Sequence, residues 1–250
     1  MSTEERKSIK DISWQVSERE YRKYPALSYS ILAKYEREGF NNLDKLFDRV
    51  ESPSLTFGSA VDTLITGNEE DFNNQFMVAQ LDNPPSDTLV NITKKLFNML
   101  KDKYPSIIDI PDEIILANIE DISWNNHWLP KTRVKKIKED CNAYYKLLYI
   151  ADGRTIINSY TYQDVINTVD KLKSSDATKF YFEQNSPFNN DIERFYQLKF
   201  KSAFSEIEYK CMADLLIVFH NDKTVVPIDL KTSSKPEWDF YKSFIDWRYE

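Results

Sequence analysis

The chain of 250 residues is poor in features that would each mark a particular class of protein. It has only two cysteines, Cys141 and Cys211, which cannot build a disulfide framework or a four-cysteine cluster site. No run approaches about 18 uninterrupted apolar residues, so a transmembrane helix is not expected. The charged residues 1–7 are followed by no apolar segment of the kind found in secretory signals. We therefore expect a protein of a reducing, cytoplasmic setting that has no membrane contact.

The chain also has fewer basic than acidic residues, with 33 Lys and Arg against 40 Asp and Glu, so its net charge is −7. A nucleic-acid-binding protein usually carries a basic footprint, so the overall sign argues against one. A site that holds metal ions with carboxylates needs acidic residues, however, and whole-chain charge does not exclude it. The length and the 14% aromatic content suffice for a sizeable core, as one large domain or a core with an insertion.

Apolar periodicity predicts the α+β class, with a helix-rich N-terminal half, then three strands and a helix. We expect a single domain, residues 1–250, whose antiparallel strands carry the site. Its expected parts are a helical arm at 1–50, a helix at 54–66, a helical and loop-rich insertion at about 80–150, and a sheet with a following helix at 192–250. The last helix has no stop signal, so we expect it to continue past residue 250.

The most informative stretch comprises two apolar runs, 215–219 and 224–228, on either side of a short Asn221-Asp222 break. This pattern predicts a β-hairpin in which His220 faces Lys223. Counting outward from that turn places Asp214 opposite Asp229. Opposite residues share one face, with Cβ atoms roughly 4.5–5.5 Å apart.

Lys231 lies two residues beyond Asp229 and is expected on the same face, while Val226, Ile228 and Leu230 point to the core. Two adjacent carboxylates repel each other unless a proton or a cation lies between them. Mg²⁺ takes one or two carboxylates and fills its remaining positions with water and phosphate. The patch therefore predicts a metal site, with the Leu230 carbonyl as a further ligand. The alternative is a surface salt-bridge triad. It is disfavoured because the flanking strands are rich in Val, Ile and Leu, as central strands are, and charged groups are costly there unless they have a purpose.

A second segment, residues 54–66, has helical spacing and carries Gly58 and Asp62 four residues apart on one face. A glycine at this place leaves room in front of the carboxylate or lets another segment approach closely. The alternative is a packing glycine beside a partly exposed Asp.

A third segment begins with five cations in eight positions and continues as an amphipathic helix over 131–149. The cations are Lys131, Arg133, Lys135, Lys136 and Lys138. Such a face is either an ordinary solvent-exposed surface or a surface that binds the phosphate backbone of a nucleic acid. We treat Arg133, Lys135, Lys136 and Lys138 as candidate DNA contacts.

Together these segments resemble the PD-(D/E)XK nuclease superfamily, in particular phage-type exonucleases of the exonuclease VIII (RecE-like) and RecB-like groups. Asp214 followed by Ile228-Asp229-Leu-Lys231-Thr232 is similar to the family's hairpin motif. Phe57-Gly58-Ser-Ala-Val-Asp62 resembles its Gly-x-x-x-His helix, and the segment from Ser28 to Tyr35 resembles its serine-rich first helix. Three segments in the family's order span most of the chain.

The resemblance implies a restriction-endonuclease-like α/β core, with a central mixed sheet and flanking helices. It implies a Mg²⁺- or Mn²⁺-dependent deoxyribonuclease, of the double-strand exonuclease type used in phage recombination or repair. On this mapping Asp214 and Asp229 hold the metal, Asp62 contributes from its helix, and Lys231 assists the attacking water. The implied partners are double-stranded DNA ends, a single-strand annealing protein and further copies of the chain, in the host cytoplasm if a phage encodes it.

Two departures from the family pattern stand out. Asp62 takes the place of the family's histidine, which implies either a changed metal preference or reduced activity. The family's Gln-x-x-x-Tyr segment is missing, and Trp247-Arg-Tyr-Glu250 lies about where it should start. Two other functions therefore stay open: a non-catalytic DNA-binding or assembly protein of the same fold, and a metal enzyme that acts on another phosphoester.

Overall fold

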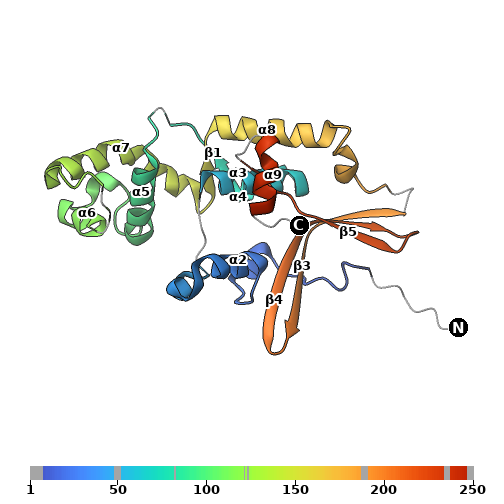
Figure 1. Cartoon of the computed structure of the whole chain (residues 1–250). Helices are drawn as coiled ribbons and strands as arrows, with labels where there is room; N and C mark the ends of the chain where they lie inside the picture. The colour runs from blue at the N-terminus through green and yellow to red at the C-terminus, as the bar shows by residue number, and fades with distance from the viewer. Residues whose placement is uncertain are drawn as a thin grey trace. The chain divides into compact units, whose positions relative to one another are not determined.

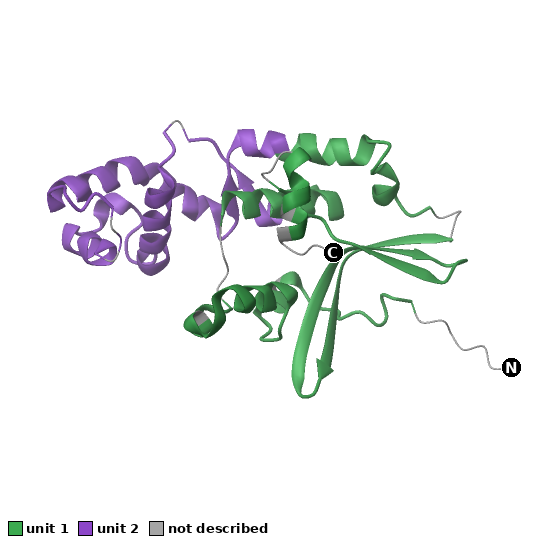
Figure 2. Cartoon of the chain, in the orientation of Figure 1, with its two compact units in different colours: residues 1–69, 165–250 green, residues 70–164 purple. Residues whose placement is uncertain are grey.

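The computed structural model describes residues 8–47, 52–81, 83–120, 122, 124–186, 191–233 and 237–246 (Figure 1). The chain divides into two compact units, the first formed by residues 1–69 and 165–250 and the second by residues 70–164 (Figure 2). The insertion predicted at about 80–150 lies within the second unit. No helix among the described residues combines the length and the apolarity needed to cross a bilayer.

The second unit is mainly helical. Its elements are α4 (Glu69–Gln75), β1 (Phe76–Val78), α5 (Asp87–Leu100), η2 (Ile107–Asp109), α6 (Asp112–Ile119), α7 (Pro130–Ala151), β2 (Thr155–Ile157) and the start of α8 (Ser159–Ser174). Helices α5, α6 and α7 enclose an apolar cluster that includes Ile92, Leu96, Ile137 and Tyr145. Strands β1 and β2 pair in parallel. The predicted amphipathic helix is confirmed, since α7 buries Val134, Ile137, Cys141 and Tyr144 on one side.

The first unit holds a three-stranded antiparallel sheet in the order β3-β4-β5, drawn in orange in Figure 1. Its elements are α1 (Glu18–Lys23), α2 (Tyr29–Glu38), η1 (Gly39–Lys45), α3 (Pro53–Thr66), the rest of α8, η3 (Lys179–Phe182), β3 (Ile192–Phe204), β4 (Ile207–Phe219), β5 (Thr224–Ile228) and α9 (Glu237–Asp246). The α+β class is confirmed. A single mixed sheet is not found among the described residues, because the parallel pair and the antiparallel strands form separate sheets.

The predicted register of the β4–β5 hairpin is confirmed. Phe219 pairs with Thr224 and Leu215 pairs with Ile228, so the next position of the ladder brings Asp214 opposite Asp229. The prediction that Val226 lies in the core is wrong, because 36% of its surface is exposed. Strand β4 is central and buries Leu215, Leu216 and Ile217, whereas β5 lies at an edge of the described sheet and has no fully buried residue.

The segment before α2 is attached to the long β3–β4 hairpin. The backbone N–H of Trp14 donates to the carbonyl of Lys199, and Leu27 forms an isolated parallel bridge with Tyr209. The side chain of Lys210 is buried, and its Nζ donates to the carbonyls of Tyr21 at 2.8 Å and Tyr24 at 2.6 Å. A cation thus meets carbonyls at the C-terminal end of α1, where the helix dipole favours positive charge.

Local signals mark the ends of two helices of the first unit. Helix α2 ends at Gly39, whose φ of 62° suits glycine. Helix α8 begins at Ser159, and the side chain of Asn158 accepts from the backbone N–H of Thr161 at 2.7 Å. The last predicted helix is observed as α9, and residues 247–250 lie outside the described residues.

Candidate metal site

Helix α3 presents three side-chain positions of the site on one face. Its start is fixed by Ser52, whose hydroxyl accepts from the backbone N–H of Leu55, and by Pro53 at the first helical position. From there, Gly58, Asp62 and Thr66 recur at intervals of four residues, which places them on one side of the helix. Helix α3 lies beside β4, so this side can meet the sheet.

Gly58 allows the segment after β5 to come very close to α3. A Cβ atom added at Gly58 would lie 2.6 Å from Oγ1 of Thr232, a separation that real Cβ atoms do not show. The second of the two roles predicted for this glycine, close approach of another segment, is therefore the one observed. This contact ties the Asp229–Thr232 segment to the helix that carries Asp62.

Asp214 is held by the opposite hairpin strand. The backbone N–H of Leu230 donates to its Oδ2 at 2.7 Å, which anchors the segment beyond the end of β5. Asp229 lies opposite Asp214 in the β4–β5 register, and its negative charge contributes to the raised pKa of Asp214. Lys231 forms an ion pair with Oδ2 of Asp229 rather than standing apart from it. These side chains differ in access, since 64% of Asp229 and 39% of Lys231 are exposed while Asp214 is partly buried.

Gln197 belongs to the same group, and the sequence analysis missed it. Its Nε2 donates to Oδ2 of Asp62 at 2.9 Å and to Oγ1 of Thr66 at 3.0 Å. The β3–β4 ladder pairs Tyr196 with Leu215 and Leu198 with Ala213, so Gln197 occupies the position opposite Asp214. The β3–β4 register therefore aligns Gln197 with Asp214, and the β4–β5 register aligns Asp214 with Asp229.

A signal for this placement exists in the sequence but is weak. Counting outward from residues 205 and 206, as was done from Asn221 and Asp222, gives Gln197 opposite Asp214. The turn is formed by Ser205 and Glu206, both at positive φ, as a two-residue hairpin turn of type I′ requires. Neither residue is the Asn, Asp or Gly that usually marks such a turn. The sequence therefore did not reveal the turn from which the strand register could be counted.

The backbone at Gln197 adopts a conformation that side-chain-bearing residues rarely take. Its φ is 51°, in the left-handed region, and the ladder is interrupted there. A residue other than glycine in this region costs roughly 1–3 kcal/mol, and such residues cluster at functional sites. The surrounding contacts hold Gln197 in this conformation.

Both central carboxylates have raised pKa values. Burial and the negative charge of Asp214 raise the pKa of Asp62 to about 6, against the hydrogen bond from Gln197, which lowers it. Burial raises the pKa of Asp214, opposed by the Leu230 N–H and reinforced by the charge of Asp229. Raised values of this kind result when carboxylates are brought together in a partly buried place, and they mark candidate functional sites.

The donor set fits a divalent cation that binds oxygen. Oδ1 of Asp62 is buried and has no hydrogen-bond partner among the described residues, although a carboxylate oxygen in such a place requires one. A cation between Asp62 and Asp214 would bind that oxygen and would also neutralise the repulsion between the two carboxylates. No three His, Cys, Asp or Glu side chains form a metal-binding group in the part of the chain that the structure describes. The protein ligands offered are thus the two carboxylates of Asp62 and Asp214, a number that Mg²⁺ or Mn²⁺ can use when water and phosphate complete the shell.

The basic residues of α7 lie in the second unit, and most are already paired. Lys138 contacts Asp112 at 2.8 Å, Lys136 contacts Asp140 at 2.9 Å, and Lys135 lies 3.8 Å from Glu139. Arg133 is partly buried, and its Nε and Nη2 lack hydrogen-bond partners among the described residues. These four residues therefore do not form one uniformly exposed basic face.

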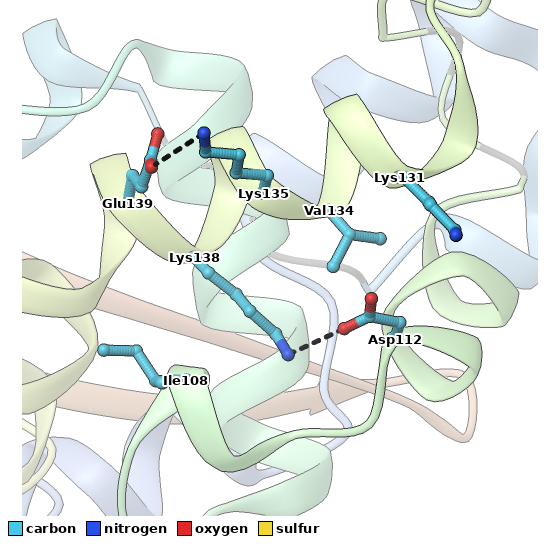
Figure 3. A pocket seen from close by; sticks show the side chains of 7 residues that line it. All are labelled: Ile108, Asp112, Lys131, Val134, Lys135, Lys138 and Glu139. Carbon is cyan, nitrogen blue, oxygen red and sulfur yellow. Dashed lines mark hydrogen bonds and ion pairs between the residues drawn. The ribbon is translucent and has the colours of Figure 1, made fainter.

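A cavity of about 340 Å³ lies along the first turns of α7 (Figure 3). Its lining combines lysines with carboxylates and apolar side chains, namely Ile108, Asp112, Lys131, Val134, Lys135, Lys138 and Glu139. Figure 3 shows that Lys135 and Lys138 each point to a carboxylate, while Lys131 extends on its own from the start of the helix. The cavity is thus mixed in charge.

Comparison with known proteins provides no family or function for this chain, so a function has to be inferred from the site. No protein-family model, no curated protein and no solved structure matches this chain.

Proposed function

We propose that this chain is a metal-dependent deoxyribonuclease of the PD-(D/E)XK type, using Mg²⁺ or Mn²⁺ to hydrolyse phosphodiester bonds. The observation that carries the proposal is the convergence of Asp214, Asp229 and Lys231 with Asp62 from a helix about 150 residues earlier in the chain. A surface salt-bridge triad would not require the partly buried third carboxylate of Asp62 or the strained Gln197 opposite Asp214.

Each side chain has a defined part in this proposal. Asp62 and Asp214 provide the partly buried carboxylate oxygens, and Asp229 extends the group toward solvent, where a DNA strand can enter. A divalent ion bound here would supply positive charge to the scissile phosphate and lower the pKa of a coordinated water. Lys231, held beside Asp229, would orient that water or neutralise charge that develops on the phosphate.

The finer parts of the proposal rest on the family resemblance. They are action on double-stranded ends, a place in phage recombination or repair, an annealing protein as partner and assembly of several copies. The cytoplasm, or the host cytoplasm for a phage protein, is the proposed location.

The test is degradation of linear duplex DNA with Mg²⁺ or Mn²⁺ by the unaltered chain and by Asp229→Ala and Lys231→Ala variants. We expect both variants to lose at least about a hundredfold in rate, as removal of a transition-state contact does. Asp222→Ala, which removes an exposed carboxylate from the turn of the same hairpin, is the control and should cleave normally. Equal cleavage by all four proteins would refute the assignment.

A different result would favour the non-catalytic alternative. In that case, the unaltered chain would bind duplex DNA in a salt-dependent way but would not cleave it with either metal ion. Cleavage of a small phosphoester but not of DNA would instead favour a metal enzyme with another substrate.

A further inference from the structure

We infer that Gln197 is a positioning residue for Asp62: its side-chain amide holds one carboxylate oxygen so that the other faces the metal-binding space. This inference rests on the proposed function, because it assigns a partner role for a proposed metal ligand. It goes beyond the segments that carry the family resemblance, none of which lies on β3.

The hydrogen bonds fix which end of the amide faces the helix. Oγ1 of Thr66 donates its one proton to the carbonyl of Asp62 at 2.6 Å, so toward Gln197 it acts as an acceptor. The amide nitrogen of Gln197 must therefore point to Thr66, and its second proton reaches Oδ2 of Asp62. Both amide protons are used, which leaves one orientation of the side chain.

This orientation determines what the Asp62 carboxylate offers. Oδ2 is occupied by Gln197, and Oδ1 is left buried without a partner among the described residues. Asp214 is arranged in a similar way, since the Leu230 N–H occupies its Oδ2. Each carboxylate is thus fixed by one protein donor. Partners of this kind orient metal ligands, and their loss typically costs 10–100-fold in metal affinity.

The backbone supplies an independent sign that position 197 serves the site. Glycine would adopt a φ of 51° without steric cost, yet the chain carries a glutamine there. If position 197 served only to interrupt the strand, Gln197→Gly would keep the interruption and relieve its strain. If the amide matters, the same variant would fold at least as well but lose the hold on Asp62.

The experiment measures Mn²⁺ binding to the full chain by titration calorimetry, together with thermal unfolding. We expect Gln197→Gly to unfold at the same temperature as the unaltered chain or higher, and to bind Mn²⁺ about 10–100-fold more weakly. Gln197→Asn also tolerates the left-handed conformation but has a shorter side chain, and it should be similarly weakened. The matched control is Ser205→Gly, which places glycine at another positive-φ position of the same hairpin and should bind normally.

The outcomes separate this inference from the proposed function. Binding by both Gln197 variants within about twofold of the unaltered chain would overturn the positioning role and leave the metal site standing. Failure of the unaltered chain to bind Mn²⁺ at all would overturn the proposed function and this inference with it. Equal weakening by Ser205→Gly would trace the loss to the hairpin as a whole and would also overturn the inference.

Discussion

Gly58 of α3 and Thr232 beyond β5 are so close that any Cβ at position 58 would lie 2.6 Å from the threonine hydroxyl oxygen. This contact joins the helix that carries Asp62 to the segment that carries Asp229 and Lys231. It brings together groups that lie far apart in the sequence. It also gives a direct way to test the assembly of the site.

Replacement of Gly58 by alanine should reveal this contact through a double-mutant cycle. Alanine favours the helix by about 1 kcal/mol over glycine, but overpacking against Thr232 costs about 1–3 kcal/mol. We therefore expect Gly58→Ala to be neutral or destabilising in the unaltered chain and stabilising by about 1 kcal/mol when Thr232→Ala removes the hydroxyl. Urea unfolding of the unaltered chain, the two single variants and the double variant gives the coupling free energy between residues 58 and 232. Additive effects would show that the two residues do not meet in solution.

The raised pKa of Asp62 predicts a stability that depends on pH. Its pKa is about 6 in the folded chain and near 3.8 when unfolded, so between these values the folded state holds the extra proton. The free energy of unfolding therefore falls as pH rises from about 4 to about 6 and stays low above that range. Asp62→Asn removes this penalty and should be more stable than the unaltered chain at pH 8 by roughly 1–3 kcal/mol, with no advantage near pH 4.

These unfolding measurements belong in a chelating buffer, because a bound cation would remove the repulsion. Asp44→Asn, in which an exposed carboxylate of η1 is replaced, is the matched control. An advantage of Asp62→Asn that is the same at pH 4 and pH 8 would contradict the assigned pKa.

The buried Lys210 should contribute strongly to stability. Lys210→Met leaves the carbonyls of Tyr21 and Tyr24 without their donor, and buried unsatisfied groups cost about 1–3 kcal/mol each. We expect a loss of about 2–4 kcal/mol in urea unfolding and faster hydrogen exchange at the Leu27 N–H, which bonds to Glu208 on the hairpin. The control is Lys201→Met, whose side chain is 35% exposed and which should lose less than about 1 kcal/mol. Comparable losses for both lysines would be inconsistent with this account.

The basic helix α7 offers a separate test of DNA contact. If Lys135 and Lys136 grip phosphates, Lys135→Gln with Lys136→Gln should lower the slope of log affinity against log salt by about 2. The control is Lys171→Gln with Lys173→Gln on α8, which removes the same charge from exposed positions. Since the α7 lysines already have carboxylate neighbours, an unchanged slope would assign them to intramolecular pairing.

Local and periodic features of the chain sufficed to predict much of the fold. The positions of α3, α7 and the three late strands follow from apolar spacing. The alignment of Asp214 with Asp229 follows from one turn, because side chains alternate strictly along a strand and the turn sets the count. The spacing of Gly58 and Asp62 likewise predicted a shared face, although it did not extend to Thr66.

Other features depend on contacts that no local pattern contains. Val226 matches a core position by alternation but lies in an edge strand, and strand order is a property of the sheet. Gln197 is placed opposite Asp214 by a turn that lacks the usual turn residues. In α7 the pairs of Lys135 with Glu139 and of Lys136 with Asp140 are four residues apart and can be read from the sequence, whereas the pairing of Lys138 with Asp112 depends on the packing of α6 beside α7.

The sequence was thus sufficient for the hairpin that carries two carboxylates and a lysine, since its alignment is set by residues within one turn. Tertiary packing of α3 against the sheet was needed to bring in Asp62 and to make Gln197 its partner. The close approach of Thr232 to Gly58 belongs to the same packing. Burial, and with it the raised pKa of Asp62, exists only once these segments meet, because desolvation and charge repulsion depend on distances in space.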